Sequence, residues 1–175
     1  MTTTAFPEAG RQGLLASPAR VADLYRAHLP GATRLAYLLT GDRATAEDVA
    51  QDAFLRVASR LGGLRDENAF PAYLHRAVVN GARNRARRLS LERRHASADT
   101  RVDQIPDVGA RDELWHALLR LPHRQRAALV LRFYLDLSEA ETAERLRCRP
   151  GTVKSAVARG LAALRADLSP EVPDA

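Results

Sequence analysis

Residues 137–165 read LSEAETAERLRCRPGTVKSAVARGLAALR, and this stretch decides the fold of the C-terminal part of the chain. Its start predicts a helix, because Ser138 and Glu141 are spaced to cap each other's backbone amides in a capping box. Pro150 cannot continue that helix, and Gly151 helps to open a second one after a short turn. Two helices joined by a short turn indicate a helix-turn-helix.

The second helix of this motif is predicted to have one apolar and one outward face. The expected buried face consists of apolar residues at intervals of four, four and three, namely Val153, Val157, Leu161 and Leu164. In a helix-turn-helix, the N-terminal half of the second helix enters the major groove of DNA. The candidates for contact with base edges are therefore Lys154, Ser155, Ala158 and Arg159. Phosphate contacts are expected from Arg149 and from the free amides near Thr152.

The charge distribution favours a nucleic-acid partner. From Arg145 to Arg165 the chain has six basic residues and no acidic one, whereas the preceding helix has three glutamates. The 175 residues together carry a formal net charge of +6, with a pI near 10.4. Such a balance attracts phosphate in a salt-dependent way. The alternative is an ordinary helical hairpin whose basic residues form a solvated face.

Helical periodicity without sustained strand-like alternation predicts an all-α protein of two small helical domains joined by a flexible linker. The expected boundaries are a flexible arm over 1–16, a first domain over 17–89, a linker over 90–109, a second domain over 110–167 and a tail over 168–175. Pro30 and Gly31 are expected to break or kink the first helix, and a later helix is predicted from about Ala69 to Leu89.

Nothing in the residues favours catalysis, a cofactor or a metal. The five histidines are scattered, and none pairs with acids or with the single cysteine, Cys148, at metal-ligand spacing: His28, His75, His95, His116 and His123. No apolar run is long enough to predict a membrane span, and no N-terminal signal pattern is present. We therefore expect a cytoplasmic protein that is not an enzyme.

Three ordered segments resemble the sigma factors of the extracytoplasmic-function (ECF) group, in the sigma-70 family. They are LLTGDRATAEDVAQDAFLRV (38–57), AFPAYLHRAVVNGARNRAR (69–87) and LPHRQRAALVLRFYLDLSEAETAERLRCRPGTVKS (121–155). The likeness covers about residues 18–167 and is greatest to the short actinobacterial members that have only sigma domains 2 and 4. It implies a subunit that binds core RNA polymerase, recognises the −35 and −10 promoter elements and opens DNA.

The resemblance also implies roles for residues of the first domain. Asp48, Gln51 and Asp52 share one helix face, and in the family this helix docks on the clamp of the largest polymerase subunit; the alternative is a solvated polar face. The implied −10 contacts, on single-stranded DNA, come from the loop at 64–68 and from one edge of the following helix. They are Arg65, Asn68, Asn80, Arg83, Asn84, Arg87 and Arg88. Helix capping or solvent contact is the alternative for Asn80 and Asn84.

The resemblance implies that the second domain is sigma domain 4. Its helix-turn-helix would bind the −35 element as duplex DNA, and its preceding helices would meet the β-subunit flap. Two residues depart from the pattern, because relatives often have a basic residue at the position of Ala156 and alanine at the position of Gly160. Members of the group are often held inactive by an anti-sigma factor. The main alternative is a conventional helix-turn-helix regulator whose first domain senses a ligand or dimerises.

Few aromatic residues are available near the −10 segment to stack on unpaired bases. Phe70 and Tyr73 both fit the expected core face at least as well as an exposed position. The hypothesis that follows is weak intrinsic DNA melting and a strict requirement for a well-matched promoter.

Overall fold

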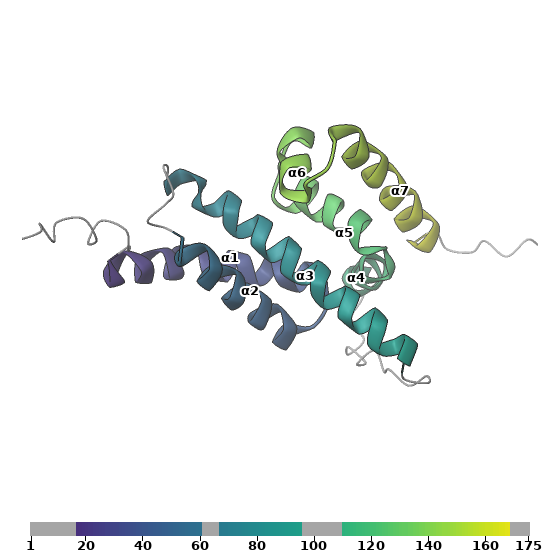
Figure 1. Ribbon diagram of the computed structural model, residues 1–175. Helices are drawn as coiled ribbons and strands as arrows, with labels where there is room; N and C mark the ends of the chain where they lie inside the picture. Colours follow the sequence, from purple (N-terminus) through teal and green to yellow (C-terminus); the bar gives the residue numbers. More distant parts are fainter. Residues whose placement is uncertain (1–16, 61–66, 96–109, 169–175) are drawn as a thin grey trace, which may run out of the picture.

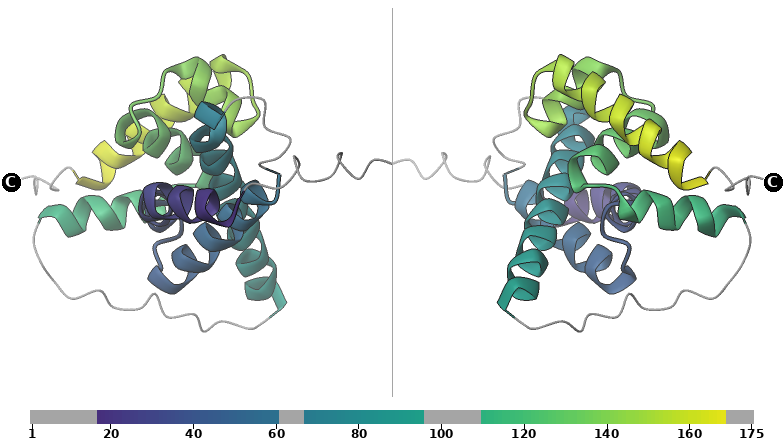
Figure 2. Two further views of the ribbon diagram at one scale, coloured as in Figure 1. Left: turned by 90° about the vertical axis from the view of Figure 1, so that its left-hand side faces the viewer. Right: turned by 90° about the vertical axis from the view of Figure 1, so that its right-hand side faces the viewer.

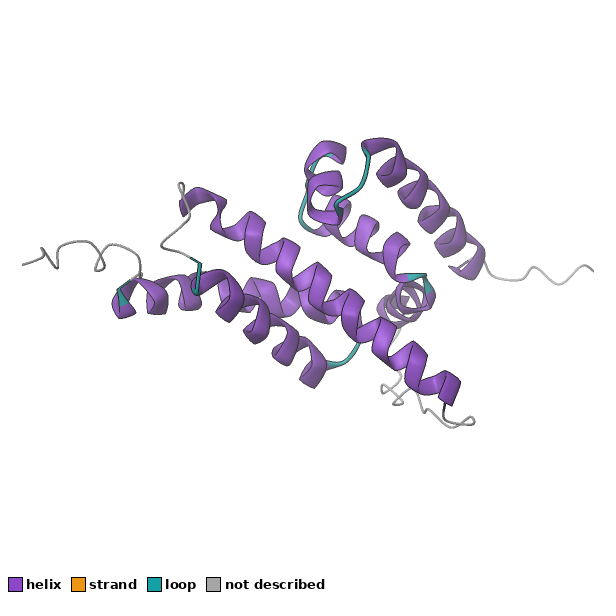
Figure 3. Ribbon diagram, viewed as in Figure 1, coloured by secondary structure: helices purple, strands orange, loops and turns teal. Residues whose placement is uncertain are grey.

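All regular structure in the described part of the chain is helical, which confirms the all-α class (Figure 3). The computed structural model describes residues 17–60, 67–95 and 110–168. The N-terminal unit consists of α1 (Pro18–Thr40), α2 (Arg43–Ala58), the 3₁₀-helix η2 (Glu67–Ala69) and α3 (Phe70–His95). The C-terminal unit consists of α4 (Ala110–Arg120), α5 (His123–Leu129), the π-helix η3 (Val130–Tyr134), α6 (Glu139–Leu146) and α7 (Pro150–Leu168). The predicted arm, most of the linker and nearly all of the tail lie outside the described residues.

Local capping explains where α1 begins and ends and where α2 begins. The side chain of Ser17 accepts a hydrogen bond from the Arg20 amide, and Pro18 occupies the first position of α1. Gly41 ends α1 in the left-handed region, with φ of 79°, and its N–H donates to the Tyr37 carbonyl at 2.9 Å. Asp42 then caps α2 by accepting from the Thr45 amide at 2.7 Å.

Helix α1 passes through Pro30 without interruption, so the predicted break does not occur. Pro30 and Gly31 are both exposed, whereas Ala32, Leu35 and Leu39 are buried on the opposite face. Packing of that face against α2 and α3 outweighs the single backbone hydrogen bond that proline removes. Helix α3 also exceeds its prediction, because it continues past Leu89 into the predicted linker and ends at His95.

The core of the N-terminal unit extends into the C-terminal unit. Its largest fully buried side chains include Phe54 and Phe70, whose rings meet edge to face with centroids 5.7 Å apart. The same cluster of buried residues includes Ala127, Val130 and Leu131 from α5 and η3. Figures 1 and 2 show α5, α6 and α7 together on one side of the N-terminal helices. The two predicted domains are therefore packed against each other.

The helix-turn-helix forms as the sequence predicts. The Glu141 amide donates to Ser138 Oγ at 3.2 Å, and the Ser138 amide donates to the Glu141 carboxylate at 2.8 Å, which completes the capping box. Arg147 ends α6 in the left-handed region with φ of 51°, and α7 starts at Pro150. The turn therefore comprises residues 147–149.

Candidate nucleic-acid interface

The outward face of α7 contains the residues predicted to contact base edges. Lys154, Ser155, Ala158 and Arg159 are all exposed, and so is Arg149 in the turn before the helix. The Ser155 hydroxyl donates to the Gly151 carbonyl at 2.9 Å, which leaves its oxygen lone pairs free to accept from a base. This face thus offers two cations and one hydroxyl within two helical turns.

Phosphate contacts were expected from free amides near Thr152. The amide of Thr152 itself donates to the Arg149 carbonyl at 2.9 Å. Its half-buried side chain still has a hydroxyl group. A phosphate at this helix start would therefore depend on Arg149 and on that hydroxyl more than on the Thr152 amide.

The two departures from the family pattern are both buried and pack inside the C-terminal unit. Ala156 is 2% exposed, and Val153 beside it is fully buried. A Cβ atom added to Gly160 would lie 2.9 Å from Leu129 Cδ1 and 3.2 Å from its Cγ. Gly160 thus lets α7 approach α5 closely, and Ala156 faces protein instead of DNA.

The acidic face of α2, defined here as Asp48, Gln51 and Asp52, is exposed at all three residues. The Asp52 carboxylate also lies 3.6 Å from the Arg56 guanidinium, in an exposed i,i+4 pair of little energetic value. Leu55 stands at the end of this face and is 65% exposed. It follows Asp52 by three positions and Gln51 by four, a spacing from which its exposure beside the acids could have been predicted.

A groove between α2 and α3 joins the acidic face to part of the predicted −10 edge. Its polar lining includes Asp48, Asp52 and Arg56 from α2 and Asn84, Arg85 and Arg88 from α3. The two helices approach closely here, because a Cβ atom on Gly81 would lie 3.0 Å from Val49 Cγ1. One wall is therefore mainly acidic and the other basic.

The other predicted −10 residues differ in their exposure and in the elements that they lie near. Arg83 is exposed, and its charge acts on His123 of α5, whereas Asn80 is half-buried. Arg87 and Asn68 are exposed. Arg65 lies outside the described residues. The predicted edge therefore has one side toward α2 and another toward the C-terminal unit.

Tyr73 and Phe70, whose positions the sequence left open between core and surface, differ in the structure. Phe70 is fully buried, but Tyr73 is 43% exposed, with the Arg76 guanidinium 5.5 Å from its ring centroid. Tyr73 precedes Arg76 by three positions and Asn80 by seven, so helical spacing places them along one edge of α3. This ring is an accessible surface on which an unpaired base could stack.

Two partly buried histidines lie where the units meet. Burial lowers the pKa of His75 to about 4, with smaller contributions from the charges of Arg145 and His28. Burial also lowers the pKa of His123 to about 4, with contributions from Arg126 and Arg83. Both imidazoles are therefore neutral at pH 7.

No group of three or more His, Cys, Asp or Glu side chains within residues 17–60, 67–95 and 110–168 could hold a metal ion. Over those same ranges, no helix has the length and hydropathy needed to cross a membrane.

Fold and site together define a two-unit, all-helical DNA-binding protein with a C-terminal helix-turn-helix. Residues 24–92 match the family model "Sigma-70 region 2", and residues 111–164 match "Sigma-70, region 4". The ECF RNA polymerase sigma factor SigM of Mycobacterium tuberculosis is 36% identical over 143 residues, covering 81% of this chain and 73% of SigM. The RNA polymerase sigma-E factor of Streptomyces avermitilis is 35% identical, covering 81% of each chain. The chain belongs to the ECF group of sigma-70 RNA polymerase sigma factors.

Solved structures share the fold at lower sequence identity. The sigma factor RpoE of Bartonella quintana, from its co-crystal structure with the anti-sigma factor NepR, matches with a TM-score of 0.69 and 21% identity, covering 86% of this chain and 97% of RpoE. CnrH, solved in complex with the cytosolic domain of CnrY, matches with a TM-score of 0.62 and 22% identity, covering 89% of this chain and 91% of CnrH. Because the family models and the relatives place the chain among sigma factors, it is a transcription initiation factor, and the conventional regulator considered above is set aside.

Proposed function

We propose that this sigma factor docks on the clamp of core RNA polymerase through the acidic face of α2, reads the −10 element as single-stranded DNA with α3, and anchors on the −35 duplex with α7. The α5–η3 region would meet the β-subunit flap, where Phe133 is 63% exposed. The protein would work in the cytoplasm, without a cofactor and without catalytic activity of its own.

The observation that carries the proposal is the separation of charge between elements. The acidic face on α2 is exposed and suits a basic partner surface, which speeds docking and fixes its register. The exposed residues Lys154 and Arg159 on α7 suit the phosphates and base edges of duplex DNA. One chain thus presents complementary surfaces to a protein and to DNA.

Single-strand reading by α3 has its own support. Arg87 and Arg88 are exposed and can contact the phosphate backbone, while the amide of Asn84 can both donate to and accept from a base. Tyr73 adds a stacking surface, which is typically worth about 1–3 kcal/mol per base. Because Tyr73 is accessible, one aromatic ring near the −10 segment is available to stack on an unpaired base. The shortage of such rings, from which we inferred weak intrinsic DNA melting, is therefore smaller than the sequence suggested.

Inhibition by a protein partner is a further part of the proposal. RpoE was solved with an anti-sigma factor, and we propose that this chain also has an anti-sigma partner. Such a partner would act by covering the acidic face of α2 or the outward face of α7, since both are exposed here.

Reconstitution with core polymerase tests the docking surface. We expect Asp48→Asn/Asp52→Asn to weaken binding to core polymerase at least tenfold, because two carboxylates that meet a basic surface are lost. Asp23→Asn, which removes an exposed carboxylate on α1, is the matched control and should bind normally. Affinity is measured by fluorescence titration, and transcription is measured from linear genomic promoter fragments. Equal binding by the double variant and the control would refute the clamp assignment.

A second arm of the assay separates DNA reading from docking. Arg159→Ala should leave binding to core polymerase unchanged but lower promoter affinity by about tenfold or more, as expected for loss of a base contact. Arg34→Ala, at an exposed arginine of α1 outside the proposed surfaces, serves as the control. Normal promoter binding by Arg159→Ala would show that Arg159 is not part of the −35 surface.

A further inference from the structure

The groove between α2 and α3 has charges of opposite sign on its two walls. Asp48 and Asp52 line it from α2, Arg85 and Arg88 line it from α3, and all four residues are exposed. Its volume is about 240 Å³, whereas pockets for small molecules usually measure about 300–1,000 Å³. The groove therefore suits side chains of a protein partner better than a small-molecule ligand.

Arg85 is a cation of this groove that has no role in the surfaces described above. Among the described residues it forms no ion pair with a carboxylate, whereas Arg56 in the same groove pairs with Asp52 at 3.6 Å. Hydrogen bonds with Thr45 hold the pKa of Asp42 below its ordinary value, and the charge of Arg85 adds to this effect. Arg85 thus lies near the start of α2, and its guanidinium is available to a partner.

Arg85 points away from the side of α3 that is proposed to contact phosphates of the −10 strand. Consecutive residues of an α-helix are rotated by about 100°, so residues two positions apart point to nearly opposite sides. Arg83 and Arg87 each stand two positions from Arg85. A DNA strand that lies along Arg83 and Arg87 therefore leaves Arg85 without a contact.

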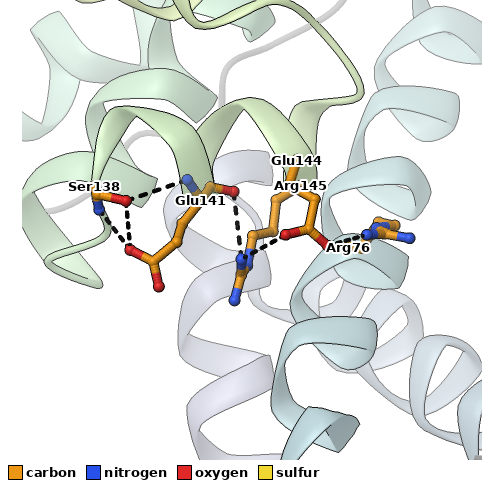
Figure 4. Close-up of polar contacts among 5 residues, drawn as sticks. All are labelled: Arg76, Ser138, Glu141, Glu144 and Arg145. Carbon is orange, nitrogen blue, oxygen red and sulfur yellow. Dashed lines mark hydrogen bonds and ion pairs between the residues drawn. The ribbon is translucent and has the colours of Figure 1, made fainter.

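The neighbours of α3 agree with this division into two sides. On the side of Arg83, the Arg76 guanidinium lies 2.7 Å from the Glu144 carboxylate of α6 (Figure 4). The charge of Arg83 itself acts on His123 of α5. Arg85, by contrast, lines the groove against α2. The side of α3 that bears Arg85 is therefore continuous with the acidic face of α2.

The opposite charges of the groove are not paired with each other. Within the described residues, neither Asp48 nor Arg85 forms an ion pair, although both line the groove. A partner surface with basic residues alone would bring like charge against Arg85, which weakens association. A partner that brings one acidic side chain beside its basic ones would neutralise both walls, and the order of its charges would fix the register of docking.

We propose that the docking surface for the polymerase clamp carries both signs of charge, with Arg85 binding an acidic side chain of the clamp while Asp48 and Asp52 bind basic ones. This inference rests on the proposed function for the identity of the partner. It adds α3 to the docking surface and gives the clamp surface a definite chemistry, which is an acidic side chain beside basic ones.

Charge reversal at Arg85 has opposite effects for the two kinds of partner. Against a clamp surface that is only basic, Arg85→Glu adds negative charge beside the acidic face and should strengthen binding. Against a clamp surface with an acidic side chain, the same variant should weaken binding by about tenfold or more, and this is the result we expect. Arg85→Gln should weaken binding by about threefold, and Arg85→Lys, which keeps the charge, should bind like the wild type.

The affinity of the full-length chain for core polymerase is measured by fluorescence titration. Arg34→Glu, the same change of charge on an exposed residue of α1, is the matched control and should bind normally. The fold of each free variant is checked by helical circular dichroism and by the emission of Trp115. Trp115 of α4 stacks on Tyr37 of α1 with ring centroids 4.8 Å apart, so its emission is sensitive to how the helices pack.

Binding by Arg85→Glu that equals or exceeds that of the wild type would overturn the inference. Comparison with Asp48→Asn/Asp52→Asn separates this result from the proposed function. If only the aspartate variant loses affinity, the acidic docking face stands and Arg85 is not part of it. If neither variant loses affinity, the clamp assignment itself fails.

A fluorescein-labelled random single-stranded 12-mer tests whether Arg85 contacts DNA instead. Arg87→Glu, on the opposite side of α3, should weaken binding of this oligonucleotide, because Arg87 is proposed to contact its phosphates. Arg85→Glu should bind it as Arg34→Glu does, since both change the net charge equally. Equal losses in Arg85→Glu and Arg87→Glu would make Arg85 a DNA contact and overturn the inference.

Discussion

Gly160 lets α7 pack close to α5, because glycine lacks the methyl group that alanine would place there. Glycine inside a helix normally lowers stability by about 1 kcal/mol relative to alanine. Here an added Cβ atom would meet Leu129 at 2.9 and 3.2 Å, and Leu129 is only 4% exposed, so it has little room to move. Overpacking of this kind costs about 1–3 kcal/mol.

We therefore predict that Gly160→Ala lowers the free energy of unfolding by about 1 kcal/mol, measured by urea denaturation, despite its better helix propensity. The sign should reverse in a Leu129→Ala background, where space for the methyl group exists. Gly151→Ala is the matched control, since nothing lies within 4 Å of its added Cβ atom. A gain in stability for Gly160→Ala in the wild-type background would contradict the close approach of α5 and α7.

At the residue scale, the sequence predicts features that are set by the periodicity of a single helix. It misses features that are set by contact with a residue of another helix. The outward position of Lys154 and Arg159 follows from the period of α7 alone, and the structure confirms it. The packing role of Gly160 depends on Leu129, which belongs to another helix. The exposure of Tyr73 stayed open in the sequence because its position lies at the margin of the apolar face of α3, where periodicity does not decide exposure.

At the element scale, α1 shows tertiary packing overriding a local break signal. Proline and glycine stand together at its centre, yet the helix continues because Ala32, Leu35 and Leu39 are buried on one face. At the starts of α1 and α2 local signals suffice, because the side chains of Ser17 and Asp42 accept hydrogen bonds from backbone amides three residues further along the chain. The predicted break at the centre of α1 is wrong, since the strength of packing against α2 and α3 is not a local property.

Gly31 gives this interpretation a test. It lies in the exposed middle of α1, and a Cβ atom added there meets nothing within 4 Å. Gly31→Ala should therefore raise the free energy of unfolding by about 0.5–1 kcal/mol, because alanine loses less backbone entropy on folding. The expected rise in Tm is about 1–4 °C for a chain of this size, followed by circular dichroism. A lower Tm would show that α1 needs a flexible point at Gly31.

At the scale of the whole molecule, the sequence predicts the two helical units but not their contact. The composition of residues 90–109 indicated a tether, but α3 continues into this segment as far as His95, and α4 begins at Ala110. The contact depends on pairs such as Arg76 and Glu144, which are 68 residues apart and which no periodicity connects. Charge signs alone did not select this pair among many arginines and acids.

The two histidines between the units make folding stability depend on pH. Burial lowers the pKa of His75 and of His123 from 6.5 to about 4, so the folded chain keeps both neutral while the unfolded chain protonates them. His75 faces Arg145 of α6 and His28 of α1, and His123 faces Arg83 of α3 and Arg126 of its own helix. Their contribution to stability is therefore complete above pH 6.5 and is lost as the pH falls from 6.5 to about 4.

We predict that each histidine lowers the free energy of unfolding by about 2 kcal/mol between pH 7 and pH 5, measured by urea denaturation. The lowered pKa values of the capping carboxylates Asp42 and Glu141 add a further loss only at more acidic pH, because both groups titrate below their ordinary values. His75→Gln/His123→Gln keeps the side chains polar and neutral, and it should remove most of the dependence between pH 7 and 5. Trp115 emission should stay constant between pH 7 and 5 and shift to longer wavelength only as the pH approaches 4, because protonation of the folded chain then places new charge beside Arg145 and Arg83. The double variant should not show this shift. An unchanged pH dependence in the double variant would place the titrating groups away from the boundary between the units.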